Sequence, residues 1–347
     1  MHYESKRSTA RHRIAFFGEL LMRLSPPRNE LPLQSPRFDV HFGGAEANVA
    51  ASLAILGHDS IMISALPDNV IGHACAGELR RHGVDTTALH YAAGRMGLYV
   101  LSPGAMHRPS DVLYDRADSV FARMSPDAYD WPHLLVGAQW LHLSGINLAL
   151  GEATAQAALA AVRAARVAGL SISFDCNYRS KLWGPRAAQA PALLHAIAAE
   201  ADVIFGNDRD IALILGVDFP HVDAIDRFRA AANAAFAAWP RLQRMASTER
   251  HYRTVDDQDI FGLMSTRDRV LTTPTHTLAG IVDRIGGGDA FAAGLLHGLF
   301  RNMTDDAALD FAIAAACLKH SIPGDVNVLR EADMLAFVEQ VGFEVKR

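Results

Sequence analysis

Short apolar runs alternate with alanine-rich helical segments along most of this chain, and this alternation limits the possible folds more than any other feature. Strands are expected at 14–19, 60–66, 140–146, 170–177 and 202–207. Helices are expected at 45–56, 70–82, 152–168, 288–301, 305–320 and 331–341. Apolar strands that alternate with helices form parallel β-α-β units, so the sequence predicts an α/β protein.

Two segments interrupt this alternation. Residues 22–42 contain four prolines and no helical period, and residues 94–121 alternate loosely between apolar and polar. Both are expected to form antiparallel strands outside the main sheet, where a small sheet would cover a site at the strand ends. The polar and basic residues 1–13 lack the apolar core of a secretion signal, and we expect a poorly ordered extension there. The domain itself is expected to cover 14–343.

The composition excludes several functional classes. The net charge of −5 is mild, which argues against a general nucleic-acid or anionic-membrane partner, and no apolar run is long enough to span a bilayer. Three distant cysteines, Cys75, Cys176 and Cys317, form neither a metal-type pair nor a disulfide framework, so a reduced, cytoplasmic setting is expected. No H-E-x-x-H pattern and no G-K-[ST] sequence occur, which excludes a zinc site of that kind and a Walker P-loop.

Residues 283–294 read D-R-I-G-G-G-D-A-F-A-A-G and carry the strongest chemical signal. Gly286, Gly287 and Gly288 precede an apolar helical pattern, so their backbone N–H groups and the helix dipole would form an anion cradle. Asp289 lies where a general base would sit if a hydroxyl attacked a bound phosphoryl group. The alternative is an ordinary acid at a helix start after a flexible loop, and G-G-G-D alone favours that alternative.

A second glycine-rich segment, residues 42–54, precedes a helix near the N-terminus. Gly43 and Gly44 would let a small ligand approach the backbone, and Asn48 would add an amide about one turn into the helix. A tight strand-to-helix turn explains the same pattern equally well. In the expected lid, Tyr114 and Arg116 are two residues apart on a strand and therefore face the same side, where they would grip an acidic, hydroxylated ligand or form an exposed pair.

Polar residues also follow two of the expected strands, at the edge of a parallel sheet where ligands bind. After the first, Asp175, Asn177 and Arg179 lie close together, and Arg179 is suited to clamp a carboxylate or phosphate unless it only forms a solvated ion pair at a helix start. After the second, Asn207 and Asp210 are spaced to hold a hydrated magnesium ion through water. Helix capping by Asn207 or Asp208 is the more common explanation of the second pattern.

Together these segments resemble the ribokinase-like, or PfkB, carbohydrate kinases over about 14–343. The family's two motifs correspond to G-G-A-E-A-N at 43–48 and D-R-I-G-G-G-D at 283–289. Within the family, G-E-L-L-M-R-L-S-P at 18–26, Y-D-R at 114–116, L-S-G-I at 143–146 and D-C-N-Y-R-S-K-L-W at 175–183 are similar to 2-keto-3-deoxygluconate kinases. The resemblance implies a three-layer α/β/α core with a mostly parallel sheet and a small β-sheet lid.

The resemblance also implies ATP-dependent phosphorylation of a sugar acid, with 2-keto-3-deoxygluconate giving its 6-phosphate, and the use of Mg²⁺. Asp289 would be the base, and the N–H groups of Gly286, Gly287 and Gly288 would hold the transferred phosphoryl group. The sugar acid would contact Gly43, Gly44, Asn48, Tyr99, Tyr114, Arg116, Arg179 and Asp289. The nucleotide would contact Asn177, Asn207, Ser247, Thr248, Arg250, Gly286 and Gly288, with Asp210 holding magnesium through water. Family members with such lids often pair, so a homodimer or higher homo-oligomer is expected.

The chain departs from the family pattern in three places. Arg284 replaces the usual threonine, and G-G-G replaces G-A-G or A-A-G. A-S-T-E-R at 246–250 stands where a K-x-G segment usually holds the nucleotide, and Asp210 replaces a glutamate. A kinase for a neutral sugar, such as a fructokinase or ribokinase, and a non-catalytic sugar-binding member of the fold are the alternatives. Two arginines favour an acidic sugar over a neutral one, and Asp289 argues against a protein that only binds.

Overall fold

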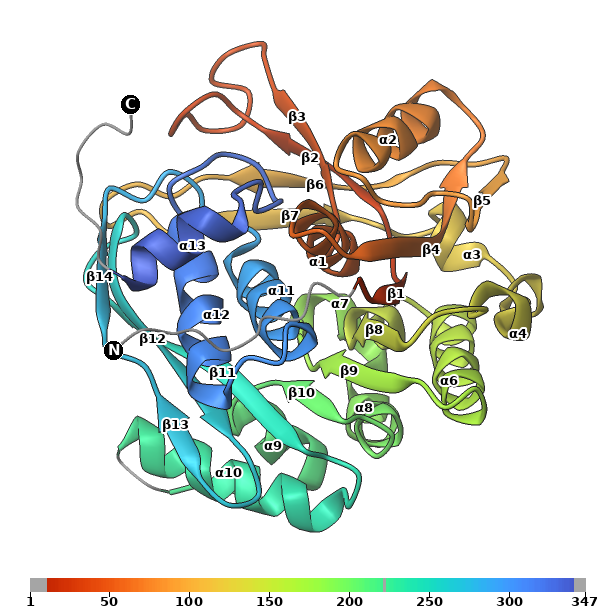
Figure 1. The fold of residues 1–347 in the computed structure, drawn as a ribbon. Coiled ribbons are helices and arrows are strands. Elements are labelled where there is room, and N and C mark those ends of the chain that lie inside the picture. Colours follow the sequence, from red (N-terminus) through yellow and green to blue (C-terminus); the bar gives the residue numbers. More distant parts are fainter. Residues whose placement is uncertain (1–10, 221–222, 340–347) are drawn as a thin grey trace.

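The computed structural model describes residues 11–220 and 223–339, which form a central sheet, helices on both of its faces, and a smaller separate sheet (Figure 1). The central sheet contains β1 (Arg13–Phe17), β4 (Asp59–Pro67), β5 (Leu89–Ala92), β8 (Trp140–Ser144), β9 (Ser171–Asp175), β10 (Val203–Phe205), β11 (Arg244–Tyr252), β12 (Asp257–Ser265), β13 (Val270–Thr272) and β14 (His276–Ala279). Their order is β13-β12-β11-β10-β9-β8-β1-β4-β5, with β14 also pairing with β12. All neighbours from β11 to β5 are parallel, and β12 pairs antiparallel with its neighbours.

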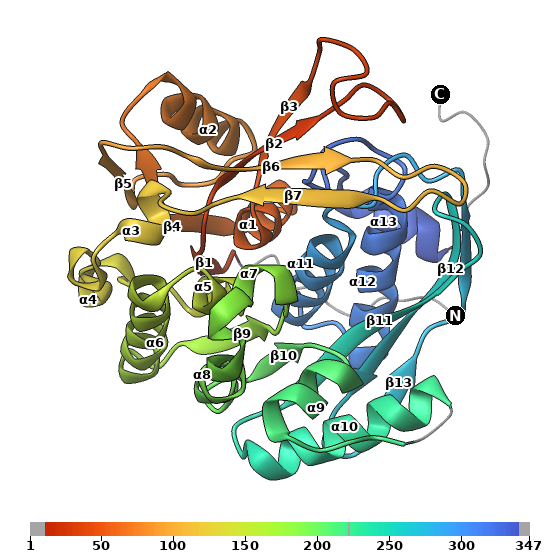
Figure 2. The ribbon, with the colours of Figure 1, turned by 180° about the vertical axis from the view of Figure 1, so that it is seen from behind.

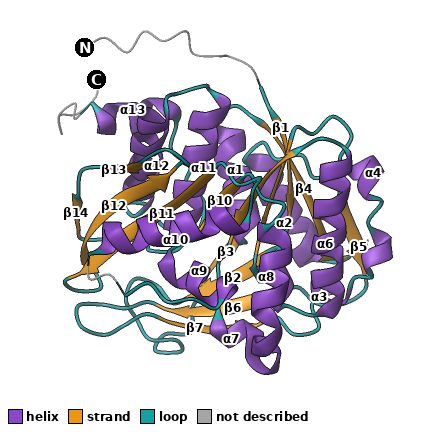
Figure 3. Cartoon of the chain, turned by 90° about the horizontal axis from the view of Figure 1, so that it is seen from below, coloured by secondary structure: helices purple, strands orange, loops and turns teal. Residues whose placement is uncertain are grey.

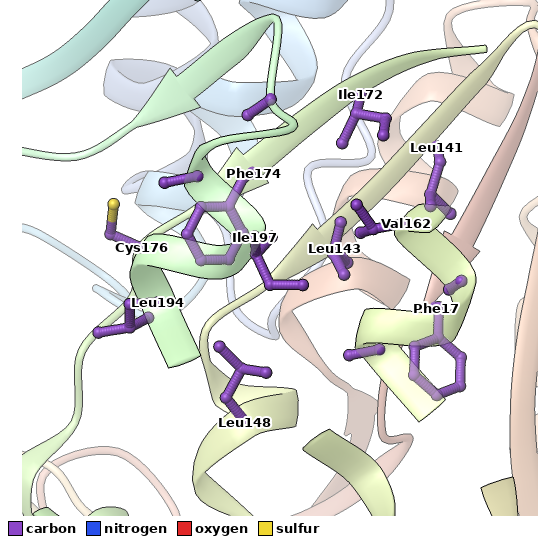
Figure 4. Packing of buried hydrophobic residues seen from close by; sticks show 14 of the residues in the cluster. Phe17, Leu141, Leu143, Leu148, Val162, Ile172, Phe174, Cys176, Leu194 and Ile197 are labelled. Carbon is purple, nitrogen blue, oxygen red and sulfur yellow. The ribbon is translucent and has the colours of Figure 1, made fainter. Parts of the chain in front are cut away.

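Two hydrophobic cores lie on opposite faces of this sheet because successive side chains of a strand point to opposite sides. In β1, Ala15 and Phe17 belong to one core, and Ile14 and Phe16 belong to the other. Figure 4 shows part of the first core, in which Phe17 lies with side chains of β8, β9 and the neighbouring helices.

The helices divide between these two cores (Figure 3). The first core packs against α3 (Val120–Arg123), α4 (Trp131–Leu134), α5 (Ile146–Ala149), α6 (Glu152–Val167), α7 (Ser180–Trp183), α8 (Ala190–Ala198), α9 (Asp208–Leu215) and α10 (Ala224–Ala238). The second packs against α1 (Ala45–Ile55), α2 (Val70–Arg81), α11 (Gly287–Phe300) and α12 (Asp305–Lys319), with α13 (Glu331–Val338) beyond them. The predicted three-layer α/β/α arrangement is therefore confirmed, and the predicted strands and helices begin and end within a few residues of the observed ones.

The smaller sheet is formed by the two segments that interrupt the alternation. It consists of β2 (Leu21–Ser25), β3 (Asp39–Gly43), β6 (Gly97–Ser102) and β7 (Asp111–Asp115), in the order β3-β2-β6-β7. We call these four strands the lid, and Figure 2 shows β6 and β7 running side by side above α1 and α11. The expectation of purely antiparallel strands is wrong at the centre of the lid, where β2 and β6 are parallel because they come from separate insertions.

The N-terminal extension that was expected at residues 1–13 overlaps the first strand of the central sheet. Arg13 belongs to β1 and pairs with Asp59, so the expected disordered extension does not reach residue 13. Residues 1–10 lie outside the described residues, as do 340–347, where the last expected helix would end. Among the helices that the structure describes, none is long and apolar enough to cross a membrane.

Candidate active site

A cavity of about 680 Å³ lies between the carboxyl ends of the central strands and the lid. It is lined by these predicted site residues: Gly44, Asn48, Tyr99, Tyr114, Arg116, Asn177, Arg179, Asn207, Asp210, Ser247, Thr248, Arg250, Gly286, Gly287, Gly288 and Asp289. Gly43, which was also predicted, does not line the cavity, and a Cβ atom there would come within 2.6 Å of Asp325 Oδ2. Motifs that are far apart in the sequence therefore meet at one place.

The start of α11 forms one wall of this cavity, and we call Gly286–Gly288 the glycine cradle. Gly286 precedes the helix with φ = 79°, a left-handed conformation that favours glycine. A Cβ atom at this position would lie 1.8 Å from the carbonyl oxygen of Asp325, so the loop also needs glycine for space. The first N–H groups of α11 consequently lie at the cavity, where the helix dipole favours an anion.

Asp289 follows in the first turn of α11, and Asn48 Nδ2 donates a hydrogen bond of 2.6 Å to its Oδ2. Burial raises the pKa of Asp289 to about 7, and the nearby Asp325 and Glu46 add to the rise. The hydrogen bond from Asn48 and the charge of Arg179 oppose it. A carboxyl group with a pKa near neutrality is suited to accept a proton at the working pH of a cell.

The start of α1 holds Asn48 in place. Gly44 caps this helix with φ = 148°, and a Cβ atom there would lie 2.3 Å from the carbonyl oxygen of Glu19. Glu46, which sequence reasoning did not single out, is buried and accepts hydrogen bonds from the Ser144 backbone N–H and from Asn147 Nδ2. Burial raises the pKa of Glu46 to about 7. These bonds fix the first turn of α1 against the end of β8, and with it the Asn48 amide.

The end of β9 supplies a second polar wall. Asp175 accepts hydrogen bonds from the backbone N–H and Nδ2 of Asn177, which has a left-handed conformation at φ = 39°. Burial raises the pKa of Asp175 to about 7, Asp289 raises it further, and Arg179 lowers it. Arg179 precedes α7, is exposed, and forms no ion pair within residues 11–220 and 223–339. An arginine without a carboxylate beside a cavity is available to an anionic ligand.

The lid contributes Tyr99, Tyr114 and Arg116. The two tyrosines pair across β6 and β7 with ring centroids 6.4 Å apart. Arg116 is buried and donates from Nε to Glu19 Oε2 at 2.7 Å. Ser119 Oγ donates to the other oxygen of Glu19. Glu19 therefore fixes the guanidinium of Arg116 at the cavity and partly neutralises its charge, a role that its position directly after the first strand did not reveal.

Asp325 also lines the cavity and was not predicted from the sequence. It lies in the loop after α12 and accepts a hydrogen bond of 2.7 Å from the Tyr99 hydroxyl. Its other oxygen accepts from Arg23 Nη1, also at 2.7 Å. The G-D sequence at 324–325 carries no local signal of this role, because the partners on β2 and β6 are brought to it only by the fold.

The remaining wall lies along β11, where Ser247, Thr248 and Arg250 reach the cavity. The Nε atom of Arg250 is buried without a hydrogen-bond partner among the described residues, as are Oδ1 of Asn177 and Oδ1 of Asn48. Buried polar atoms normally have hydrogen-bond partners, so these three atoms, one each on β11, after β9 and on α1, are groups that a polar ligand would complete. Arg284 also faces the cavity, with its guanidinium carbon 4.7 Å from the centroid of the Tyr252 ring.

Asn207 and Asp210 form a capping box at the start of α9. Asn207 Oδ1 accepts from the backbone N–H groups of Arg209 and Asp210, and Asp210 Oδ2 accepts from that of Asn207. The capping interpretation thus accounts for their spacing. Asp210 still lines the cavity, and one carboxylate is enough for a magnesium ion that keeps most of its waters. In the described part of the chain, no group of three or more His, Cys, Asp or Glu side chains could hold a metal ion directly.

Known proteins share both the sequence pattern and the fold. The family model described as pfkB family carbohydrate kinase matches residues 11–242 and 263–331. A 2-dehydro-3-deoxygalactonokinase from Haloferax volcanii is 32% identical, with 91% of this chain and 93% of that protein covered. A fructokinase from Klebsiella pneumoniae is 31% identical, with 88% and 91% covered. The crystal structure of 2-dehydro-3-deoxygluconokinase from Thermotoga maritima superposes with a TM-score of 0.91 at 34% identity, covering 94% of this chain and 99% of that one.

Proposed function

Because the chain belongs to the pfkB family of carbohydrate kinases, we propose that it transfers a phosphoryl group from ATP to a hydroxyl of a 2-keto-3-deoxy sugar acid. The preferred substrate is 2-keto-3-deoxygluconate, which would give the 6-phosphate. One observation carries the proposal: Asp289, the glycine cradle and the arginines Arg116 and Arg179 line a single cavity. That arrangement supports a base, an anion site and a carboxylate clamp within reach of one small substrate.

In this proposal Asp289 accepts the proton of the attacking hydroxyl, and Asn48 orients its carboxylate through the 2.6 Å hydrogen bond. The N–H groups of the glycine cradle stabilise the negative charge on the transferred group. Phosphoryl transfer depends mainly on positioning and charge stabilisation, and both come from rigid helix starts here. Arg179 and Arg116 hold the sugar carboxylate, while Tyr99 and Tyr114 cover the sugar.

ATP would bind along β11, against Ser247, Thr248, Arg250 and the glycine cradle. The partnerless Nε of Arg250 supports this placement, because a phosphate oxygen would satisfy it. Bound Mg²⁺ would neutralise phosphate charge, and Asp210 is the nearby carboxylate that would hold its waters. Asn177 and Asn207 offer further amides at this end of the cavity.

A kinase for a neutral sugar is the second candidate, since the fructokinase from Klebsiella pneumoniae is 31% identical to this chain. The unpaired Arg179 argues for the acid, because a neutral sugar would leave its charge without a counter-ion. ADP release should be measured with ATP, Mg²⁺ and a panel that contains 2-keto-3-deoxygluconate, its galactonate epimer, fructose and ribose. We expect one of the sugar acids to give the highest kcat/KM. Highest activity on fructose or ribose refutes the sugar-acid proposal, and no ADP release with any sugar favours the non-catalytic alternative.

Replacing Arg179 with alanine should raise the KM for the sugar acid about 10- to 100-fold, because a charge-assisted bidentate interaction is lost. The KM for a poor neutral substrate should change by less than about threefold. Lys181→Ala is the matched control, since Lys181 lies two residues away and pairs with Asp111 on the surface. Equal losses on both substrates would assign Arg179 to ATP binding or to the fold instead of the carboxylate.

The expected homodimer would form through the outer face of the lid. Strand register places Val40, Leu24, Val100 and Leu113 in one row across all four strands, on the face opposite Tyr99. Val40 is 51% exposed and Leu113 is 66% exposed. A flat apolar row of this kind is self-complementary across a two-fold axis, so a second copy of the chain is the partner that we propose.

Leu113→Glu should therefore convert a dimer into a monomer, which light scattering after size-exclusion chromatography would detect. Val167→Glu is the control, because Val167 is 91% exposed at the end of α6, away from the lid. That variant should remain dimeric. A wild-type chain that runs as a monomer at micromolar concentration would contradict the lid dimer.

A further inference from the structure

Arg23 lies on β2 and connects the lid to the loops that shape the glycine cradle. Its Nη2 pairs with Asp283 Oδ2 at 2.7 Å, its Nη1 with Asp325 Oδ1 at 2.7 Å, and its Nε donates to Ser25 Oγ at 2.6 Å. The side chain is only 5% exposed. All three nitrogens of one guanidinium are thus used inside the protein, and two of them bind acids that precede or support the cradle.

Both acids fix backbone next to the transfer site. Asp283 accepts from the backbone N–H of Ile285 through Oδ1 and from that of Gly324 through Oδ2, each at 3.0 Å. It therefore ties the loop before the cradle to the loop after α12. The carbonyl oxygen of Asp325 packs directly under Gly286, as the 1.8 Å distance from a Cβ atom placed there indicates. The position of the cradle depends on both loops, and Arg23 binds both.

The charged groups packed around Arg23 make its contacts with Asp283 and Asp325 sensitive to a change of charge. Lys319 is buried nearby, and its Nζ donates to the carbonyl oxygen of Ile322 at 3.2 Å. Burial lowers the pKa of Lys319, while Asp283 and Asp325 raise it. Two cations and two carboxylates are thus packed together, and removal of the Arg23 charge would leave a buried carboxylate without a counter-ion. A second cavity of about 370 Å³ borders Arg23 and Asp283, on the same face of the lid as Tyr99.

We propose that Arg23 is a positioning residue for phosphoryl transfer, which holds the glycine cradle and Asp289 at the correct place relative to the lid and makes the lid and the cradle one mechanical unit. The proposal rests on the kinase function proposed above. Arg23 does not touch the substrate in this role, because each of its three nitrogens already contacts Ser25, Asp283 or Asp325 and the side chain does not line the main cavity. Its effect should therefore appear in turnover and in the mobility of the cradle, with little effect on sugar binding.

Arg23→Lys and Arg23→Ala test the proposal. Lysine keeps the charge but lacks the planar fork that reaches two carboxylates, so kcat should fall at least tenfold while the KM for the sugar acid changes by less than about threefold. Arg23→Ala should lose more, and added guanidinium chloride at tens of millimolar should restore part of its kcat through the second cavity. Urea, which is isosteric and neutral, should not restore it. Arg95→Ala is the control, because Arg95 lies just before β6 and forms an exposed pair with Asp115 at the end of β7.

Hydrogen exchange separates this inference from the function on which it rests. In the substrate-free Arg23→Lys protein, the amides of residues 284–290 should exchange at least tenfold faster than in the wild type, and those of α6 should not change. Hydrogen exchange does not require enzymatic activity. It therefore tests whether Arg23 connects the lid to the glycine cradle even if the wild-type protein phosphorylates no sugar in the panel. Unchanged exchange at 284–290, a kcat within twofold of the wild type, or a loss confined to the KM of the sugar acid would each overturn the proposal. If Arg23→Ala does not fold, Arg23→Lys decides.

Discussion

Replacing Asp289 with asparagine is expected to lower kcat by at least about a hundredfold, which is the usual effect of losing a general base. The asparagine side chain has the same size and still offers an oxygen to Asn48 Nδ2. The KM for the sugar acid and the melting temperature should therefore change little. Asp306→Asn is the matched control, because Asp306 is also an acid in the first turn of a helix but pairs with Arg269 on the surface. If the kcat of Asp289→Asn is close to the wild-type value, Asp289 is not the general base.

The same carboxyl group predicts the pH dependence of the reaction. A base must be ionised, and burial raises the pKa of Asp289 to about 7, so kcat/KM should fall as the pH drops below about 7 and level off above it. Asp175 and Glu46 also have pKa values of about 7, mainly because of burial. Asp289 raises the pKa of Asp175, and Glu46 raises the pKa of Asp289, so the observed midpoint belongs to the coupled group of acids. The residual activity of Asp289→Asn should lack most of this pH dependence. If its pH profile is the same as that of the wild type, another acid causes the pH dependence.

The sequence predicted those parts of the site that depend on local signals. Three glycines before an apolar helical pattern define a helix start wherever they occur, which is why the cradle and Asp289 were expected where the structure has them. Polar residues after an apolar strand likewise indicate the ligand-binding edge of a parallel sheet. Asn207 and Asp210 show the limit of such signals, because one spacing serves both a capping box and a site for hydrated magnesium.

The parts that were missed depend on contacts between distant residues. Arg23 and Asp325 are 302 positions apart, and Glu19 and Arg116 are 97 positions apart, so no local pattern pairs them. Arg284, which departs from the family pattern, lies over the ring of Tyr252, 32 positions earlier on β11. The parallel pairing of β2 with β6 has the same origin, because each strand belongs to a different insertion.

The two outer glycines of the cradle should respond differently to the same added methyl group. At Gly286 the backbone is left-handed and the new Cβ atom would meet the Asp325 carbonyl oxygen at 1.8 Å, so one of the two loops must move. Gly286→Ala should therefore lower the free energy of unfolding by about 2 kcal/mol or more. It should also reduce kcat by at least about a hundredfold, since a displacement of about 1 Å at a transfer site has that effect.

At Gly288 a Cβ atom would meet nothing within 4 Å, although this glycine also lines the cavity. Gly288→Ala should consequently leave the free energy of unfolding within about 0.5 kcal/mol of the wild type, because alanine is accepted well in a helix. Its methyl group would stand where the phosphates are proposed to approach, so the KM for ATP should rise and kcat should fall. Thermal unfolding and steady-state kinetics on both variants separate the two roles. If Gly288→Ala binds and uses ATP like the wild type, the phosphates do not contact this turn of α11, and the anion site must be placed closer to Arg250.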